Sequence, residues 1–199
     1  MLIRFFDFLF ATLALICFLP FFLLIALLIV LGSKGGAFYK QLRVGKNNRD
    51  FYLLKFRTMR VGADQKGLLT VGDKDPRVTP IGFFLRKYKL DELPQLLNVL
   101  LGQMSLVGPR PEVRKYVDLY TEQQKQILSV RPGITDYASL SYIDENEILS
   151  KSDQPELTYI RQIMPEKIEL NYKYIKNQTV KEYFKIIFLT VKSIMFHRL

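Results

Sequence analysis

The chain has 199 residues, of which 49% are hydrophobic and 13% are aromatic, and it contains 11 glycines and 9 prolines. This composition excludes a disordered or fibrous protein and is sufficient for one domain with a buried core. Lys and Arg outnumber Asp and Glu by 29 to 19, which favours an anionic partner such as nucleic acid, anionic lipid or a phosphorylated substrate. The single cysteine, Cys17, excludes an internal disulfide bond.

The first predicted element is an apolar run from Phe8 to Leu31 that contains no charged residue. A helix of about 24 residues rises about 36 Å, which is enough to cross a hydrocarbon core of about 30 Å. The run is longer than the apolar part of a signal peptide, and no A-x-A-like cleavage site follows it. Pro20 interrupts the run, and because proline removes a backbone hydrogen bond, the helix must bend or break there.

Two topologies are compatible with this proline-broken helix: a kinked full crossing, or a re-entrant hairpin with both ends on one side of the membrane. Hydropathy does not separate them. The residues after the run indicate that this side faces the cytoplasm, because basic loops are retained there. These basic residues are Lys34, Lys40, Arg43, Lys46 and Arg49. We therefore expect a membrane helix over residues 1–33 and a cytoplasmic, membrane-associated domain over residues 34–199.

A β-hairpin is the next predicted element. Residues 37–44 and 51–59 are rich in β-branched and aromatic residues, and they flank the turn-forming sequence GKNNRD. Residues 61–82 then carry four glycines and two prolines among polar residues, which indicates a long irregular connection. Loops of this length inside a domain are often functional.

Two helices are expected around an acidic pair. The first covers residues 81–90, and the second covers residues 92–104, where leucines recur at i, i+3 and i+4. Asp91 precedes the second helix, so its simplest interpretation is an N-cap, with Glu92 in the first turn. Pro94 fits the same first turn, where no backbone N–H needs an acceptor.

The following segment should be extended, because Pro109 and Pro111 both bias the residues before them away from the helical region. Arg110 is thereby held between two stiff residues. We expect a polar helix over residues 112–126, a loop over residues 131–135, and partial helix over the acid-rich residues 136–170.

The last 20 residues predict a basic amphipathic helix, in which Lys181, Lys185 and Lys192 share one face and aromatic and aliphatic residues fill the rest. Two interpretations remain open. The helix lies in the headgroup plane of a membrane, or it packs on the core of the domain. His197, the only histidine, has no obvious ligand companions, so we assign it no metal or catalytic role.

The acidic pair also suits a chemical role. An ionised Asp91 can attack phosphorus and form an aspartyl phosphate without a base to deprotonate it first. Such a step brings negative charges together, so it needs nearby cations and usually a divalent metal. The chain offers five basic residues near this pair in sequence or in the predicted hairpin: Lys55, Arg57, Arg86, Lys87 and Arg110. With the membrane segment, they indicate transfer of a phosphorylated group to a lipid.

Several stretches of the chain resemble the bacterial sugar transferase family, the small monotopic polyprenol-phosphate phosphoglycosyltransferases. They are FYKQLRVG at 38–45, KFRTM at 55–59, DPRVTPIGFFLRKYKLDELPQLLNVLLGQMSLVGPRPE at 75–112 and RPGIT at 131–135, together with the proline-broken N-terminal segment. The resemblance covers about residues 1–137. Residues 134–147, ITDYASLSYIDENE, depart from the family's usual glycine-containing continuation and could face the sugar or the uridine.

The resemblance implies an α+β, mainly helical, monotopic membrane protein with an N-terminal re-entrant helix broken at Pro20, a small β-hairpin and interfacial amphipathic helices. It implies a location at the bacterial inner membrane with the catalytic domain on the cytoplasmic face. The implied reaction transfers a hexose 1-phosphate from a UDP-sugar to undecaprenyl phosphate, releases UMP and starts a surface glycan. Neither the sugar, the glycan pathway nor the oligomeric state follows from the sequence.

The resemblance also implies roles for individual residues. Asp91 is the nucleophile, which forms a covalent phosphosugar intermediate. Glu92 assists, either by holding Mg²⁺ together with Asp91 or by accepting a proton from the lipid phosphate, and both options stay open. The family's Pro-Arg-Pro motif makes Arg110 the best candidate for a phosphate clamp. The weaker candidates for the same substrate contact are Lys55, Arg57 and Arg86.

Two other classes of protein are compatible with the charge of the chain. One is a non-enzymatic monotopic scaffold that binds anionic lipids, in which Asp91 is only a helix cap. Because asparagine caps helices about as well as aspartate, an Asp91→Asn variant should behave normally in a scaffold and lose turnover in an enzyme. The other is a nucleic-acid binder, against which the membrane segment and the lack of a recognisable recognition module argue.

Overall fold

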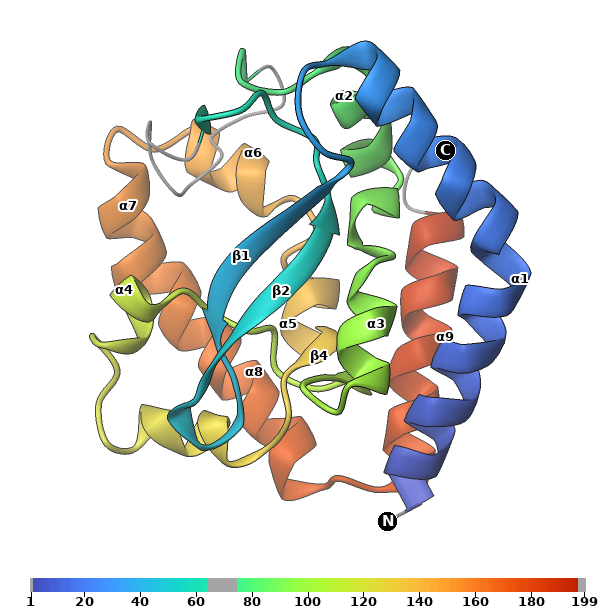
Figure 1. Ribbon diagram of the computed structural model, residues 1–199. Helices are drawn as coiled ribbons and strands as arrows, with labels where there is room; N and C mark the ends of the chain where they lie inside the picture. The colour runs from blue at the N-terminus through green and yellow to red at the C-terminus, as the bar shows by residue number, and fades with distance from the viewer. Residues whose placement is uncertain (1, 64–74, 197–199) are drawn as a thin grey trace.

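The computed structural model describes residues 2–63 and 75–196 (Figure 1). The described chain is mainly helical, with one antiparallel two-stranded sheet and one parallel pair of short strands. The predicted α+β, mainly helical class is therefore confirmed. Residues 64–74 of the predicted long connection, and His197, lie outside the described residues.

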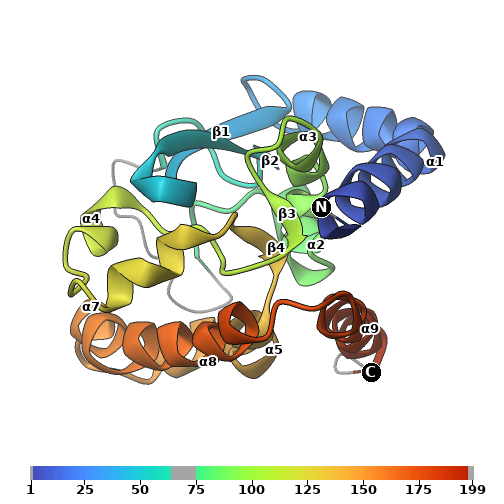
Figure 2. The same cartoon turned by 90° about the horizontal axis from the view of Figure 1, so that it is seen from below.

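Helix α1, Leu2–Gly32, is continuous and contains Pro20. Figure 2 shows that α1 changes direction along its length, in agreement with the bend expected at a proline. In the described chain it is the one helix long and apolar enough to cross a membrane, and only 17% of its most apolar window is buried inside the protein. A core helix of a water-soluble protein would not leave so much apolar surface uncovered.

The inner face of α1 packs on the rest of the molecule along its length. Ala11 contributes to a buried cluster with Leu53 and Val99, and Ile29 belongs to a second cluster with Phe56 and Leu85. The helix therefore lies against the hairpin and the helices that follow it, instead of projecting away from them (Figure 1).

The N-terminal end of α1 is anchored by a buried carboxylate. Asp7 accepts hydrogen bonds from Ser105 Oγ (2.9 Å), Leu106 N (2.9 Å) and Tyr183 Oη (3.0 Å). Arg4, one turn earlier, donates to a backbone carbonyl oxygen at the end of helix α3, Leu100 O (3.2 Å). Three segments far apart in sequence thus meet at this end of the helix.

The predicted hairpin is confirmed. Strand β1, Phe38–Val44, pairs antiparallel with β2, Asp50–Phe56, and the two are joined by a short 3₁₀ helix, η1, Lys46–Asn48. Asn47 and Asn48 have φ of 57° and 59°, a left-handed conformation that asparagine tolerates better than most residues.

Helix α2, Pro80–Lys87, begins with a capped turn that sits on the end of the hairpin. Thr79 accepts a hydrogen bond from Gly82 N (3.1 Å) and donates to Thr58 O (3.2 Å). A Cβ atom at position 82 would collide with the backbone of Thr58, so glycine is required for this close approach. The predicted short helix is confirmed, and its position relative to β2 is set here.

The prediction that Asp91 caps a helix is wrong. Asp91 lies inside a 3₁₀ turn, η3, Leu90–Glu92, which follows Lys89 in a left-handed conformation with φ of 56°. Helix α3 begins later and is shorter than predicted, Gln95–Leu100, with Pro94 at its N-cap position. The left-handed residue ends α2 and turns the chain, so the acidic pair stands between two helices and caps neither.

The segment after α3 differs from its prediction in two places. Residues 133–135, expected to be a loop, form strand β4, Gly133–Thr135, which pairs parallel with β3, Ser105–Val107. The predicted helix over residues 112–126 is interrupted: it consists of α4, Arg114–Val117, and a 3₁₀ helix, η4, Gln124–Ser129. Thr121 and Gln124 exchange backbone-to-side-chain hydrogen bonds of 2.9 and 3.2 Å, and this capping box starts a new turn.

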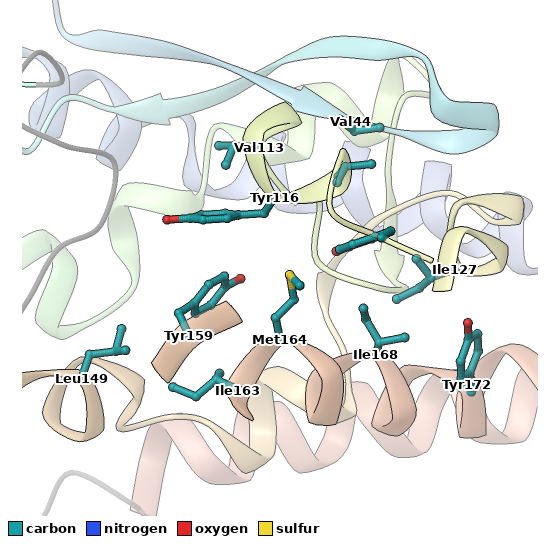
Figure 3. Close-up of a cluster of buried hydrophobic side chains, with 12 residues drawn as sticks. Val44, Val113, Tyr116, Ile127, Leu149, Tyr159, Ile163, Met164, Ile168 and Tyr172 are labelled. Carbon is teal, nitrogen blue, oxygen red and sulfur yellow. The ribbon is translucent and has the colours of Figure 1, made fainter. Parts of the chain in front are cut away.

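The segment 136–170 is partly helical, as predicted. Its elements run into the longer helix α8 and cover one side of a core that the hairpin and α4 cover from the other (Figure 3). These elements are α5 (Tyr137–Ser141), α6 (Glu145–Ser150), α7 (Pro155–Thr158), the π-helix η5 (Tyr159–Ile163) and α8 (Met164–Lys176).

The predicted C-terminal helix is present as α9, Val180–Phe196. Its first half packs on the core, where Tyr183 and Ile186 are fully buried. Its second half leaves Phe188, Ile194 and Phe196 exposed. Packing on the core is therefore confirmed for the first half of the helix, and a position of the second half in the headgroup plane of a membrane stays a prediction.

Candidate active site

Residues from four separate elements converge on the acidic pair. Asp91 and Glu92 lie on η3, Lys55 comes from β2, Arg86 comes from α2, and Arg110 follows β3. Lys55 and Arg110 contact Glu92 directly, and the charges of Lys55 and Arg86 act on Asp91. The structure thus brings together five of the six residues that the sequence assigned to a site.

Glu92 is held by two cations. Arg110 Nη1 donates to Glu92 Oε2 at 3.0 Å while Arg110 Nη2 donates to Oε1, so the guanidinium binds the carboxylate with both of its arms. Lys55 Nζ lies 3.5 Å from the same Oε1. Burial acts to raise the pKa of Glu92, but the charges of Arg110 and Lys55 outweigh it and hold this pKa well below its ordinary range.

Asp91 has the opposite environment. Its side chain is buried, and it accepts no hydrogen bond from any residue in the described ranges. Burial raises the pKa of Asp91 above its ordinary value, and the neighbouring charge of Glu92 adds to the effect. Lys55, Arg86 and Lys89 act in the other direction without cancelling it.

The two adjacent carboxylates are therefore differentiated. Pairs of acids whose pKa values are pushed apart by their surroundings are typical of sites that use them for different tasks. Glu92 is held in its ionised form by its paired cations, whereas the oxygen atoms of Asp91 accept no hydrogen bond within residues 2–63 and 75–196. Of the two, Asp91 is the one available for bond formation.

The cations around the pair are themselves partly desolvated. Burial lowers the pKa of Lys55 and of Arg86, and the acids Glu92 and Asp91 respectively oppose this. Arg86 is oriented by a hydrogen bond from its Nε to Thr58 Oγ1 (2.9 Å). The side chain of Arg110 keeps 33% of its surface accessible, so an anionic ligand can reach it.

Arg57, the sixth predicted site residue, lies elsewhere. It donates to the backbone oxygens of Ser33 (2.9 Å), Lys34 and Gly35 (3.2 Å), where α1 ends. Its guanidinium therefore satisfies carbonyl groups at the C-terminal end of a helix. The structure does not place it beside Asp91 or Glu92, and a contact with substrate stays a prediction.

Two residues that fix the position of the site, Asn98 and Asp136, were not identified from the sequence. Asn98 donates to Tyr52 O (2.8 Å) and accepts from Leu54 N (3.0 Å), which fixes α3 to the strand that carries Lys55. Asp136 accepts from Arg110 N at 2.9 Å, which fixes the backbone of the Pro-Arg-Pro segment. A signal exists for Asn98 alone, since an amide inside the apolar run LLNVLL needs buried partners.

The donor set is compatible with Mg²⁺ but small. No cluster of three or more His, Cys, Asp or Glu side chains occurs among residues 2–63 and 75–196. Mg²⁺ is usually bound by one or two protein carboxylates together with substrate phosphates and water. Asp91 and Glu92 meet this requirement, and the unoccupied oxygens of Asp91 are the better ligands.

With the geometry in place, comparison with known proteins is informative. Residues 1–197 match the family described as "Bacterial sugar transferase". The chain belongs to this family. Several curated relatives carry names that describe transfer of a sugar phosphate to undecaprenyl phosphate, which agrees with the resemblance found in the sequence.

Three of these relatives illustrate the range of the bacterial sugar transferase family. A UDP-N-acetylgalactosamine-undecaprenyl-phosphate N-acetylgalactosaminephosphotransferase from Aeromonas hydrophila is 38% identical over 95% of this chain and 42% of its own length. A UDP-glucose:undecaprenyl-phosphate glucose-1-phosphate transferase from Escherichia coli is 36% identical over 93% and 38%. The exopolysaccharide production protein ExoY of Rhizobium meliloti is 34% identical over 98% and 86%. The chain thus spans about two fifths of the first two relatives.

An exposed apolar surface lies beside the site. The exposed apolar residues of α1 continue onto α2, at Phe83, Phe84 and Tyr88, and onto the second half of α9. Figures 1 and 2 place α1 and α9 on the same side of the molecule. The contribution of α2 is not evident from the sequence, because its apolar residues are interrupted by Arg86 and Lys87.

Proposed function

We propose that this protein transfers a hexose 1-phosphate from a UDP-sugar to undecaprenyl phosphate through a covalent intermediate on Asp91. The observation that carries the proposal is the buried Asp91 carboxylate, free of hydrogen bonds from the described residues, next to three cations and the end of a membrane helix. The relatives' names supply the substrate classes. They differ in the sugar, so none is assigned to this chain.

In the proposed first step, an oxygen of Asp91 attacks the sugar-proximal phosphorus of the UDP-sugar. The new O–P bond forms as the bond from this phosphorus to the bridging oxygen breaks, and UMP leaves. Arg86 and Arg110 bind the phosphate oxygens and offset the negative charge that accumulates. Burial of Asp91 removes water from around the nucleophile, and it also prevents competing reactions with water.

In the second step, a phosphate oxygen of undecaprenyl phosphate attacks the same phosphorus. The O–P bond to Asp91 breaks, which restores the carboxylate and leaves a lipid diphosphate sugar as product. The exposed apolar surface formed by α1, α2 and α9 would hold the lipid chain close to the acid pair. A location at the inner membrane, with this site on the cytoplasmic face, places it where both substrates are found.

Of the two roles considered for Glu92, holding Mg²⁺ and accepting a proton, its surroundings argue against the second. A carboxylate whose pKa is held well below its ordinary range is a weak base, which argues against proton removal from the lipid phosphate. Its pairing with Lys55 and Arg110 supports a role in positioning those cations. Asp91 and Glu92 would also hold Mg²⁺, whose charge would offset that of the diphosphate.

We also propose the re-entrant topology for α1. Both of its ends are bound to the same domain, the first through Asp7 and the second through Ser33 and Arg57. A straight crossing would separate these ends by the thickness of the bilayer. To test this, Ile3 is replaced by cysteine in a Cys17→Ser background, since Cys17 is exposed. Labelling from the cytoplasmic side alone supports re-entry, and labelling from outside contradicts it.

The chemical proposal is tested by isolating the intermediate. Purified protein is incubated with a UDP-sugar labelled in its sugar-proximal phosphate, without lipid acceptor. We expect a labelled adduct on wild type that disappears when undecaprenyl phosphate is added, and no adduct on Asp91→Asn. An active enzyme without an adduct would mean direct transfer between the substrates and would refute the nucleophile assignment.

A further inference from the structure

A cavity of about 130 Å³ lies directly behind the Pro-Arg-Pro segment. Arg110 and Glu112 line one side, and residues of α8 such as Met164 and Ile168 line the other. In Figure 3, Tyr116 on one layer faces Tyr159 and Met164 on the opposite layer. An engineered apolar cavity of ~150 Å³ holds a benzene molecule, so a cavity of this order admits a small ligand or part of a larger one.

The lining of this partly open cavity is polar. It contains two ion pairs: Arg43 Nη1 lies 3.1 Å from Glu112 Oε1, and Lys167 Nζ lies 2.8 Å from Glu145 Oε2. The charges of each pair cancel, which leaves Arg110 as the unbalanced charge at the end of the cavity nearest Glu92. Away from Arg110, the cavity is therefore suited to a neutral ligand with many hydrogen-bonding groups, and less suited to a phosphate.

Two buried atoms of this lining have no hydrogen-bond partner within the described chain. They are Asn171 Oδ1, an acceptor, and Arg43 Nε, a donor. The other polar atoms of both side chains are engaged, since Asn171 Nδ2 donates to Asp136 (2.8 Å) and Arg43 Nη2 donates to Gln41 (2.9 Å). Buried polar atoms left unpaired are costly, and a bound polar molecule is a common explanation.

The cavity and the proposed active site share Arg110. Arg110 lines the cavity and also holds Glu92. The charge of Arg43 acts on Lys55, and that of Glu92 acts on Arg43. A group bound in the cavity would thus be attached to a phosphate bound at Arg110.

We infer that this cavity holds the sugar of the donor and that Glu145 and Lys167 help to select it. The inference rests on the proposed function. A hexosyl group carries donors and acceptors in several directions, as the two ion pairs require. The flat uracil ring fits less well, because the rings of Tyr116 and Tyr159 touch, with centroids 4.9 Å apart, and leave no slot between them.

Glu145, on α6, lies within residues 134–147, the segment that departs from the family's usual continuation, although the family match itself extends to residue 197. Lys167 reaches this segment from α8 through its ion pair with Glu145. The phosphate-binding residues lie outside the departing segment. The inference therefore gives that departure a role, which is to adapt a shared reaction to a particular sugar.

The test compares two ion-paired acids on the same helix. Glu145→Gln removes a charge from the cavity, and Glu147→Gln removes one from an exposed pair with Lys151 (2.6 Å) as the matched control. For each variant, kcat/KM is measured with UDP-glucose, UDP-galactose and UDP-N-acetylgalactosamine, and UMP is measured as an inhibitor. We expect Glu145→Gln to lose about tenfold or more in kcat/KM for the preferred sugar, with unchanged inhibition by UMP.

A second pair of variants guards against a folding artefact. Ile168→Phe fills the cavity without removing a charge, and Ile175→Phe makes the same change on α8 at a residue that does not line the cavity. Ile168→Phe should lower kcat/KM for the preferred UDP-sugar, and Ile175→Phe should not. Thermal unfolding of both variants shows whether they are folded.

Three outcomes would overturn the inference. Equal weakening of UMP and of the UDP-sugar by Glu145→Gln would assign the cavity to the nucleotide. Normal kinetics for both Glu145→Gln and Ile168→Phe would mean that the cavity holds only water. Wild-type protein that releases no UMP from any UDP-sugar would overturn the proposed function, and the inference with it, whereas the first two outcomes leave the proposed function intact.

Discussion

Two of the buried aspartates in the described chain, Asp7 and Asp91, have opposite surroundings. Asp7, at the start of the membrane helix, is 1% exposed and accepts three hydrogen bonds. Asp91, between α2 and α3, is 7% exposed and accepts none from the described residues. Both side chains are shielded from water, but of the two only Asp7 accepts hydrogen bonds from the described residues in place of those to water.

This difference separates a structural acid from a reactive one. The hydrogen bonds to Asp7 join α1, β3 and α9, and any reaction at Asp7 would have to break them. Arg110 and Lys55, which lie near Asp91, instead donate their hydrogen bonds to Glu92. Glu92 thereby keeps the cations close to Asp91 without letting them occupy its oxygens.

The largest expected effect is that of Asp91→Asn on turnover. Without an ionisable nucleophile, we expect the rate to fall by about 10³-fold or more. Stability should change in the opposite direction. Because the pKa of Asp91 is raised on folding, its ionised form at pH 7 is disfavoured in the folded state, and asparagine removes this cost.

Thermal unfolding in detergent at pH 7, beside a UMP-release assay, measures both quantities for Asp91→Asn. A variant that is inactive but less stable than wild type would contradict the comparison, since Asp91 would then be a structural acid like Asp7.

A smaller effect is expected for Asp7→Asn, and it should fall on stability. The change removes the charge that three donors bind, so we expect a loss of about 2–4 kcal/mol in the free energy of unfolding. Turnover per folded molecule should remain near that of wild type. Tyr183→Phe, which deletes one donor, should cost about 1 kcal/mol. Denaturant titration in detergent gives these values, and full stability of Asp7→Asn would show that the hydrogen bonds contribute little.

The smallest expected effect is a shift in the pH profile, and it tests the pKa of Asp91 itself. The charge of Lys55 acts to lower the pKa of both acids, so Lys55→Met should raise the pKa of Asp91 and that of Glu92. Asp91 must be ionised to react, and the acid limb of the profile of kcat/KM against pH should therefore move to higher pH. Lys40→Met, at an exposed lysine of the same hairpin, is the control. A limb that stays in place, or moves to lower pH, would remove Lys55 from the electrostatics of the site.

Local elements were largely predictable from the sequence. The hairpin, the apolar helix and the extended Pro-Arg-Pro segment each follow from a periodicity or from proline sterics within a few residues. The short strands β3 and β4 were missed because three residues carry no readable alternation. The role of Asp91 as a cap was wrong because the left-handed Lys89, which redirects the chain, leaves no signal in sequence.

The site was only partly predictable, because its geometry depends on contacts between distant residues. Lys55 and Arg57 looked equivalent in sequence, yet one pairs with Glu92 and the other binds the end of α1. The structural role of Asp7 depends in the same way on a distant contact, since its partner Tyr183 lies near the other end of the chain. Asp136, which holds the backbone of Arg110, was likewise invisible without the fold.

The position of Arg57 has a mechanical consequence. Its guanidinium donates hydrogen bonds to the carbonyl oxygens where α1 ends. Lys55, two residues earlier in the chain, is paired with Glu92. A change in the depth or angle at which α1 sits in the lipid would therefore move Arg57 and shift the lysine relative to the glutamate, so the lipids around α1 would tune the rate of the proposed phosphate transfer.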